Sequence, residues 1–340
     1  MTHAQLQADY LSAIKLRILD HPQWPMVFKI SQIFKKNGFE CCLVGGSVRD
    51  YLMGLTPKDL DLVTDAKPED ITPLFDKVLE MGFRFGVSQI VFDGEIVDVA
   101  TFRREDIYLD GRHPEKIIYA RMEEDYSRRD FTVNSLYFDL LKGQLHDFCG
   151  GISDIQTKTL KAVGNPQQRF LEDHLRILRG IRFAAKFDLQ IEPNTCDALR
   201  ACKDLVLKLS KHRITEELKK GFYLSERIVY LKQLKAFGLW DLLFPGIDLK
   251  LDFVDPAVFS KLKLISWSTF LASLFICFPK MAEKAVSRSQ KKAELESFFE
   301  HLLLLKQEKK EILVICQNYP MDIQRQSEFI FSEFLKKLQL

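Results

Sequence analysis

The sequence of 340 residues contains no hydrophobic run long enough to cross a membrane. Its longest apolar stretches, such as Leu271 to Phe278, fall well short of the ~18 residues that a transmembrane helix needs. The N-terminal stretch contains no apolar core of signal-peptide length, because Asp9, Lys15, Arg17 and Asp20 interrupt it. We therefore expect a cytoplasmic protein that makes no contact with a membrane.

Cysteine is present without the spacing that zinc sites or disulfide frameworks use. No two of the seven cysteines form a CxxC pair. They are Cys41, Cys42, Cys149, Cys196, Cys202, Cys277 and Cys316. We interpret them as small buried hydrophobic residues in a reducing compartment, and we expect no zinc.

The formal net charge of +2 gives no indication of a polyanionic partner, but the two halves of the chain differ. Residues 1–150 carry 18 basic and 24 acidic side chains, whereas residues 151–340 carry 31 basic and 23 acidic ones. Such asymmetry is typical of a polyanion-binding half beside a half that gathers carboxylates for another purpose. Chance unevenness of surface charge is the alternative.

The hydropathy pattern predicts an α+β protein, in which a head with a small mixed β-sheet and helices precedes an all-α neck, body and tail. We divide the chain into a head over 1–150, a neck and body over 151–250 and a helical tail over 251–340. In the head we expect helices over 4–37, from 48 and over 68–81, strands over 41–44, 60–63, 89–92, 95–102 and 134–140, and a mobile loop over 103–128. Beyond it we expect helices over 170–187, 210–222, 228–237 and most of 256–340.

Two aspartates, Asp59 and Asp61, stand two residues apart on a predicted strand, so their side chains point the same way. Carboxylates held so close repel each other unless a cation lies between them. A pair of Mg²⁺ ions accepts such ligands and promotes phosphoryl transfer. A DxD sequence alone is also an ordinary turn or edge-strand motif.

The residues around the aspartates favour the first interpretation. Upstream, Gly45-Gly46-Ser47-Val48-Arg49-Asp50 leaves a strand and opens a helix, where glycines and N–H groups approach phosphates and Arg49 can pair with them. Asp98 on the second hairpin strand is a third acidic candidate, and a solvent-facing hairpin residue is its alternative. Glycine pairs in turns are frequent by themselves.

This order of motifs resembles the catalytic head of nucleotidyltransferases of the DNA polymerase beta superfamily. The string LVGGSVRDYLMGLTPKDLDLVTDA at 43–66 resembles one branch, the bacterial class II tRNA nucleotidyltransferase (CCA-adding enzyme) and poly(A) polymerase family. The resemblance implies template-independent addition of C and/or A to the 3′ end of tRNA from CTP and ATP, and it implies that the tail over 251–340 binds RNA. It implies Asp59, Asp61 and Asp98 as catalytic residues and two Mg²⁺ ions on Asp59 and Asp61.

Two downstream segments extend the resemblance. VDVATFR at 97–103 is similar to the third-carboxylate segment of the family, with Asp98 where many relatives carry Glu. SRRDFTVNSLYFD at 127–139 is similar to its ribose- and phosphate-binding segment, which implies contacts from Arg129, Asp130 and Asn134. Without the family, these three residues would be interpreted as a charged cap on a strand.

A helix over 169–187 is predicted to select the base. On a helical wheel Asp173, Arg176, Arg179 and Gly180 fall on one side, away from the apolar residues. A carboxylate acceptor beside guanidinium donors matches the Watson–Crick edge of C or A and not that of G or U. The alternative is a surface salt bridge worth only ~0.2–0.5 kcal/mol. The segment resembles the EDxxR template of the family, which implies base contacts from Glu172, Asp173, Arg176 and Arg179.

The sequence leaves the member of the family open. Asp110 to Pro114 resembles the flexible loop of CCA-adding and A-adding enzymes, and residues 321–340 lack the strongly basic extension of poly(A) polymerases. We therefore favour a tRNA 3′ end, with another RNA 3′ end as the alternative partner and no DNA. An A-adding enzyme and a poly(A) polymerase remain as alternatives, as does a non-catalytic RNA-binding protein.

Overall fold

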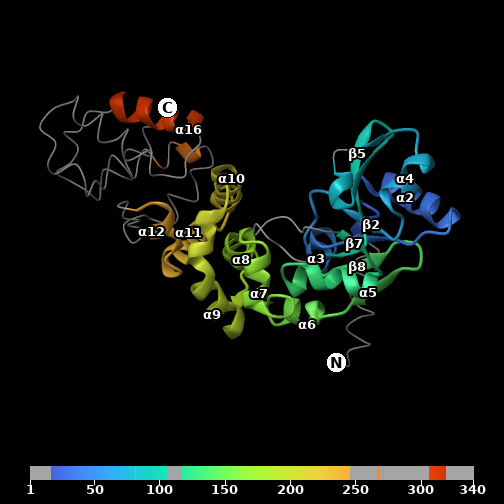
Figure 1. Ribbon diagram of the computed structural model, residues 1–340, viewed down its shortest axis with the longest axis horizontal. Coiled ribbons are helices and arrows are strands. Elements are labelled where there is room, and N and C mark those ends of the chain that lie inside the picture. Colours follow the sequence, from blue (N-terminus) through green and yellow to red (C-terminus); the bar gives the residue numbers. More distant parts are fainter. Residues whose placement is uncertain are drawn as a thin grey trace, which may run out of the picture. The chain divides into compact units, whose positions relative to one another are not determined.

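The computed structural model describes residues 17–80, 82–105, 117–245, 266–268, 271 and 306–318 (Figure 1). The chain divides into two compact units, one formed by residues 1–173 with 190–196 and the other by residues 174–189 with 197–340. Within the described residues, no helix is long and apolar enough to span a membrane.

The first unit is built on a seven-stranded mixed sheet, which confirms the predicted α+β class. The strands lie in the order β3-β4-β5-β2-β1-β8-β9. They are β1 (Cys41–Val44), β2 (Leu62–Thr64), β3 (Val78–Leu79), β4 (Val87–Phe92), β5 (Glu95–Thr101), β8 (Leu136–Asp139) and β9 (Gln144–Asp147). Neighbouring strands are antiparallel except β2 and β5, which run parallel.

The centre of this sheet forms the core of the head. Every residue of β1, β2 and β8 is buried. Helix α2 (Trp24–Lys36) contacts β1, and α3 (Gly46–Leu52) contacts β1 and β8. Helix α2 buries its apolar face, including Val27, Ile30 and Phe34. Each such side chain contributes roughly 1.5–3 kcal/mol when it leaves water, so this packing holds the short central strands in place.

Strands β4 and β5 form the hairpin that Asp93-Gly94 predicts. Both turn residues have positive φ, 50° for Asp93 and 84° for Gly94, as a two-residue turn requires. The register pairs Gln89 with Asp98 across the hairpin. The hairpin prediction is confirmed, and the turn fixes which residues of β5 lie beside β4.

Two predicted helices of the head are shorter than expected. The helix expected over 4–37 is interrupted by a turn, so α2 begins at Trp24 with Pro25 in its first turn, where a missing N–H costs nothing. The helix expected over 68–81 ends early, because Pro73 cannot donate an N–H in a helix interior. There α4 (Pro68–Ile71) passes into the 3₁₀ turn η1 (Thr72–Leu74) and then β3. Residues 4–16 lie outside the described residues.

The segment 103–128, expected as a loop, is folded at both ends. Strands β6 (Arg103–Glu105) and β7 (Ile117–Tyr119) pair antiparallel, and α5 (Met122–Asp125) leads into the 3₁₀ turn η3 (Tyr126–Arg128). The loop prediction is wrong for these ends. The strand Ile117–Tyr119 consists of β-branched and aromatic residues, but it is too short to stand out among the charged residues around it. Residues 106–116 lie outside the described residues.

Short elements complete the first unit. They are η2 (Phe83–Phe85), η4 (Thr132–Asn134), α6 (Gly151–Gln156), β10 (Thr159–Leu160), α7 (Pro166–Glu172) and β11 (Gln190–Ile191), which pairs parallel with β10. Helix α9 (Pro193–Cys202) begins in this unit and continues in the next. The Asp147 carboxylate accepts the N–H groups of Gly151 and Ile152 and so caps α6.

The described part of the second unit is helical, as predicted. Its elements are α8 (Leu175–Lys186), η5 (Lys203–Lys208), α10 (Lys211–Phe222), α11 (Arg227–Ala236), α12 (Leu239–Leu243) and α16 (Lys306–Asn318). A buried ion pair of 2.5 Å between Arg182 Nε and Glu217 Oε1 joins α8 to α10. Most of the predicted tail lies outside the described residues.

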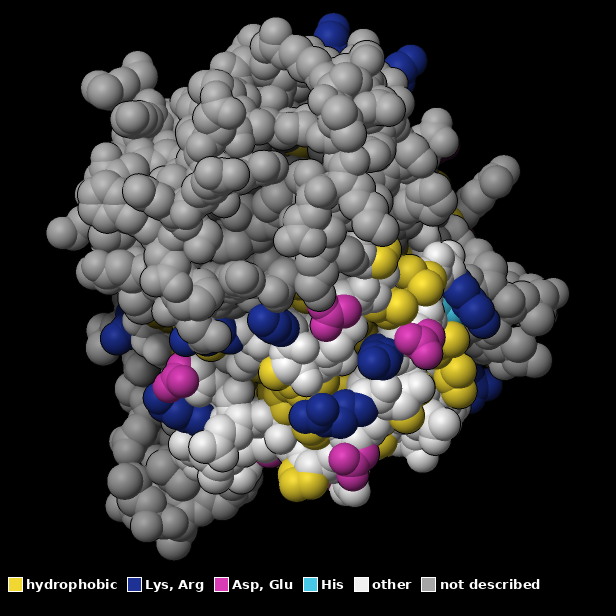
Figure 2. Space-filling view, turned by 90° about the vertical axis from the view of Figure 1, so that its left-hand side faces the viewer, with side chains coloured by type: hydrophobic (Ala, Val, Ile, Leu, Met, Phe, Trp, Pro, Cys, Tyr) yellow, Lys and Arg dark blue, Asp and Glu magenta, His cyan; other side chains and the backbone are white. Residues whose placement is uncertain are grey.

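Charged side chains are mixed on the surface that Figure 2 presents. On its described part, Lys and Arg side chains are spread among acidic and hydrophobic ones and do not gather into one patch. Exposed lysines of the second unit lie on α10 and α11, at Lys211, Lys220, Lys232 and Lys235. Within the part of the second unit that the structure describes, these lysines are thus spread along two helices.

Candidate functional site in the head

The glycine turn lies where β1 passes into α3. Gly45 has a φ of +67°, a conformation that favours glycine, and its N–H donates to the Leu136 carbonyl at 3.0 Å. The buried Ser47 hydroxyl donates to the Val44 carbonyl at 3.0 Å and so closes the turn. A Cβ at Gly45 would lie 3.4 Å from Arg129 Nη1. The structure thus brings the glycine turn against Arg129, which the sequence motifs name separately.

The acidic candidates meet because β2 and β5 run parallel. Leu62 pairs with Val99, so the preceding residues, Asp61 and Asp98, occupy neighbouring positions on the two strands. The Gln89 amide donates to Asp98 Oδ1 at 2.9 Å across the hairpin. Asp59 and Asp61 precede β2 and do not lie within it, which corrects the predicted strand over 60–63. The chain there is extended enough for the Asp61 carbonyl to accept the Val44 N–H at 3.2 Å.

The segment that carries Asp59 and Asp61 is held by residues before α2. The Gln23 amide oxygen accepts the N–H of Leu60, the residue between the two aspartates, at 2.9 Å. The His21 ring Nε2 lies 3.1 Å from the Pro57 carbonyl. Sequence reasoning missed both contacts, because they join segments that no short motif connects.

The surroundings of Asp61 disfavour the ionised form of its carboxylate. Loss of water contact, followed by the nearby Asp98 and Asp59 carboxylates, raises the pKa of Asp61 from 3.8 to about 6, although Arg129 lowers it. Like charges held this close favour uptake of a proton or a cation. The site is therefore prepared for a positive ligand.

Asp125 is the centre of a second cluster beside this site, and sequence reasoning missed it. Its fully buried carboxylate accepts hydrogen bonds from Arg128 Nε at 2.8 Å, Arg129 Nη2 at 2.9 Å and the Tyr137 hydroxyl at 2.8 Å. Burial opposes its ionised form, but Arg128 and Arg129 outweigh burial and hold the pKa of Asp125 well below its usual range. Asp125 ends an acidic run, Glu123-Glu124-Asp125, that resembles ordinary surface charge, so only its burial identifies it.

A third cluster links the glycine turn to the segment before β8. Arg49 is buried, with Nε on Asp50 Oδ1 at 2.8 Å and Nη1 bonded to Asn134 Oδ1. Asn134 Nδ2 donates to Asp130 Oδ1 at 3.0 Å. The structure thus joins Arg49, Asp130 and Asn134 in one network, although Arg49 is engaged with protein partners.

The expected base-selecting helix is two helices. Helix α7 ends at Glu172 and α8 begins at Leu175, and Asp173 between them has extended backbone. The prediction of one helix over 170–187 is therefore wrong. Asp173 and Arg176 do not lie on one face of a single helix, as the helical wheel had predicted. The two residues belong to different units of the chain.

Glu172 and Arg179 are engaged with neighbouring side chains. Glu172 pairs with Arg169 at 2.6 Å. The Arg179 guanidinium lies over the Phe183 ring at 5.0 Å, while Arg176 is buried on α8. Gly180 is buried on α8 as well.

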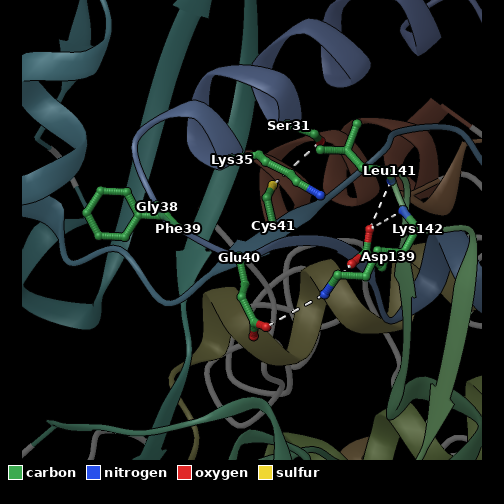
Figure 3. A pocket seen from close by; sticks show the side chains of 9 residues that line it. All are labelled: Ser31, Lys35, Gly38, Phe39, Glu40, Cys41, Asp139, Leu141 and Lys142. Carbon is green, nitrogen blue, oxygen red and sulfur yellow. Dashed lines mark hydrogen bonds and ion pairs between the residues drawn. The ribbon is translucent and has the colours of Figure 1, made fainter.

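A hollow of about 190 Å³ lies at the opposite end of β1 from the glycine turn (Figure 3). Two lysines line it, Lys35 and Lys142, and Lys142 is paired with Asp139 at 3.3 Å and Glu40 at 3.9 Å. Burial raises the pKa of the Cys41 thiol to about 12, so this cysteine is no nucleophile. None of the glycine-turn or aspartate candidates lines this hollow.

The acidic site fits a hard cation by the chemistry of its donors. Asp59, Asp61 and Asp98 supply carboxylate oxygens, which Mg²⁺ prefers. Burial, followed by the Asp98 and Asp59 carboxylates, raises the pKa of Asp61, so its ionised form would be favoured by a bound cation. Among the described residues, no three His, Cys, Asp or Glu side chains stand close enough to enclose a metal ion. Any cation here would therefore take further ligands from water or a substrate.

A mixed sheet with paired carboxylates beside a glycine turn, followed by helices, is the architecture of a nucleotidyltransferase head. Residues 41–161 match the family model described as the poly A polymerase head domain. Residues 188–251 match the model described as "Probable RNA and SrmB-binding site of polymerase A". The chain belongs to the poly(A) polymerase and CCA-adding enzyme family.

CCA-adding enzymes and poly(A) polymerases are both similar to this chain. A CCA-adding enzyme of Staphylococcus epidermidis is 35% identical over 65% of this chain and 56% of its own length. Poly(A) polymerase I of Salmonella typhi is 35% identical over 64% of this chain and 50% of its own. The chain thus spans about half the length of the curated relatives it matches.

A crystal structure supports the same assignment. The Bacillus stearothermophilus CCA-adding enzyme in complex with CTP is 26% identical, with a TM-score of 0.66 over 93% of this chain and 82% of that one.

Removing the charge of Asp98 tests the crowding at Asp61. We predict that Asp98→Asn lowers the pKa of Asp61 from about 6 toward 3.8, because the repulsion that disfavours the ionised form is lost. The measurement is a carboxyl NMR titration of the metal-free protein. Asp93→Asn, in the turn of the same hairpin, is the matched control and leaves the titration unchanged. An unaltered Asp61 titration in Asp98→Asn would contradict the account.

Proposed function

We propose that this chain is a template-independent RNA nucleotidyltransferase that adds C and/or A to the 3′ end of tRNA from CTP and ATP. The observation that carries this proposal is the neighbouring position of Asp61 and Asp98 beside the glycine turn. It is supported by relatives named as CCA-adding enzymes and by the structure solved with CTP.

The acidic residues would carry the chemistry. Asp59 and Asp61 would hold two Mg²⁺ ions, with Asp98 as the third catalytic carboxylate. When bound, such ions lower the pKa of an RNA 3′-hydroxyl and stabilise the departing pyrophosphate. The protein contributes the fixed spacing of the carboxylates, which the parallel strands impose. It also contributes the hydrogen bond from the Leu60 N–H to the Gln23 amide oxygen, which holds the segment between the two aspartates.

The nucleotide would lie along the glycine turn. Gly45, Gly46 and Ser47 would approach its triphosphate, where Arg129 adds positive charge. Asp130 and Asn134 would contact the ribose. Arg49 would act from the same network, in which it holds the Asn134 amide.

Base choice would come from the segment after α7. Asp173 would accept a hydrogen bond from the exocyclic amine of C or A, and Arg176 would donate to the neighbouring ring nitrogen. Glu172 and Arg179 would support these two side chains. A carbonyl of G or U would face the Asp173 carboxylate and be repelled.

The helical second unit would hold the RNA through phosphate contacts and shape. The exposed lysines on α10 and α11 and the matched RNA-binding family model support this role. The Thermotoga maritima CCA-adding enzyme, solved with tRNA, shares the fold at 19% identity.

A second candidate is a poly(A) polymerase, favoured by the similarity to the Salmonella typhi enzyme. An A-adding enzyme is a third form of the same reaction. A non-catalytic RNA-binding protein is disfavoured, because clustered carboxylates would repel RNA and contribute nothing to binding it.

Product length separates these activities. The protein is incubated with Mg²⁺ and with tRNA ending at the discriminator base, tRNA ending in CC, or an unrelated RNA. A CCA-adding enzyme extends the first tRNA by CCA when CTP and ATP are both present. Addition of only A to the CC-ending tRNA indicates an A-adding enzyme, and long A tracts on any RNA indicate a poly(A) polymerase. No transfer to any RNA would contradict the proposal.

Loss of one carboxylate tests the chemistry directly. We predict that Asp61→Asn lowers the transfer rate by about 1000-fold, which corresponds to losing ~4 kcal/mol of electrostatic stabilisation. Asp76→Asn, an exposed aspartate of the same unit, is the control and retains the rate. The Asp61 role is refuted if Asp61→Asn is as active as the control.

Loss of the Asp173 carboxylate tests base choice. We predict that Asp173→Ala raises incorporation of U and G relative to C and A by about tenfold or more, since a charge-assisted hydrogen bond and a repulsion are both removed. The measurement is competition between radiolabelled nucleotides, with the exposed Asp197→Ala on α9 as control. Unchanged selectivity in an active Asp173→Ala protein would overturn the assignment.

A further inference from the structure

The Arg129 guanidinium is held on one edge only. Its Nε lies 3.2 Å from Asp125 Oδ2 and 2.9 Å from the Tyr137 hydroxyl, and its Nη2 lies 2.9 Å from Asp125 Oδ2. The guanidinium also lies 5.0 Å from the centre of the Tyr137 ring. These contacts fix both the plane and the rotation of the group.

The remaining nitrogen faces the glycine turn. Nη1 takes part in none of the hydrogen bonds found among the described residues of the head, and a Cβ at Gly45 would lie 3.4 Å from it. Glycine at this position therefore leaves space in front of a fixed donor. Arg129 also acts on Asp61, whose pKa it lowers.

One carboxylate anchors two arginines in this cluster. Asp125 binds Arg128 at Oδ1 and Arg129 at Oδ2. The Asp125 side chain has no exposure, whereas the Arg129 side chain keeps 15%. The Arg129 guanidinium therefore keeps some contact with solvent, while the carboxylate that anchors it is buried.

We propose that Asp125 is a positioning residue for nucleotide binding, which holds the Arg129 guanidinium with Nη1 directed at the triphosphate of the incoming nucleotide. Asp125 touches no substrate and acts through Arg129 alone. Because the orientation exists before the nucleotide arrives, binding need not spend free energy on ordering this side chain. The inference rests on the proposed function and deepens it.

Arg128 supplies an internal comparison. It binds the other oxygen of the same carboxylate, at 2.8 Å, and lies one residue from Arg129. If Asp125 serves only the stability of the fold, both arginines should matter equally to nucleotide binding. If Asp125 positions Arg129, loss of Arg129 should weaken nucleotide binding and loss of Arg128 should not.

The test is direct binding of CTP and of ATP in the absence of RNA, by calorimetry on the full chain. We expect Asp125→Asn to weaken binding about tenfold or more, since the charge-assisted pair that fixes the guanidinium is lost. Arg129→Gln should weaken binding at least as much, and the double variant should be no weaker than Arg129→Gln alone. In steady-state assays Asp125→Asn should raise the nucleotide KM more than it lowers kcat.

Matched variants keep the test decisive. Arg128→Gln removes an ion pair to the same carboxylate and should leave nucleotide affinity within about threefold of wild type. Tyr137→Phe keeps the carboxylate and removes one hydroxyl, so it replaces Asp125→Asn if that variant does not fold. It should weaken nucleotide binding about threefold and lose this effect in the Arg129→Gln background.

Three results would overturn the inference: wild-type affinity in folded Asp125→Asn and Tyr137→Phe, equal losses in Arg128→Gln and Asp125→Asn, or additive losses in the double variant. Failure of the proposed function is distinguishable from these. A wild-type chain that binds CTP and ATP but extends no RNA contradicts the function and leaves the binding test of Asp125 intact.

Discussion

The parallel pairing of β2 with β5 is the constraint on which the head depends. It sets Asp61 and Asp98 at neighbouring positions, although the two residues come from distant parts of the chain. The cost is visible in the raised pKa of Asp61. A fold that only needed stability would not keep uncompensated like charges together, so the pairing is best understood as preparation for a positive ligand.

The positive charge that acts on Asp61 comes from Arg129, whose side chain is held in one orientation. Arg129 lies between the acidic site and the glycine turn, and Asp125 and Tyr137 hold it there. The anchoring carboxylate is buried and the arginine is partly exposed. A nucleotide triphosphate beside cations would meet donors on one side and carboxylates on the other without rearrangement of the protein.

Local sequence predicted those features that depend on neighbouring residues. The Asp93-Gly94 turn defines its hairpin, and the strand before Gly45 and the helix after it follow from hydropathy and the glycine turn. Resemblance to the family then indicated the site residues in the order in which the chain carries them.

Features that depend on distant contacts could not be predicted in this way. The wheel that joined Asp173 to Arg176 assumed an unbroken helix, whereas the backbone is extended at Asp173. Asp125 resembled surface charge because its partners Arg103 and Tyr137 reach it only in the folded head. The brace from Gln23 to Leu60 joins segments that hydropathy treats independently.

The most direct test of the account is calorimetric titration of the nucleotide-free protein with Mg²⁺ at several pH values. Because a cation and a proton compete for Asp61, the account predicts that Mg²⁺ affinity rises as the pH increases through about 6 and that binding at lower pH releases protons. Asp61→Asn should abolish both effects. Mg²⁺ binding that is independent of pH across this range in the wild type, or a pH dependence that persists in Asp61→Asn, would contradict the account.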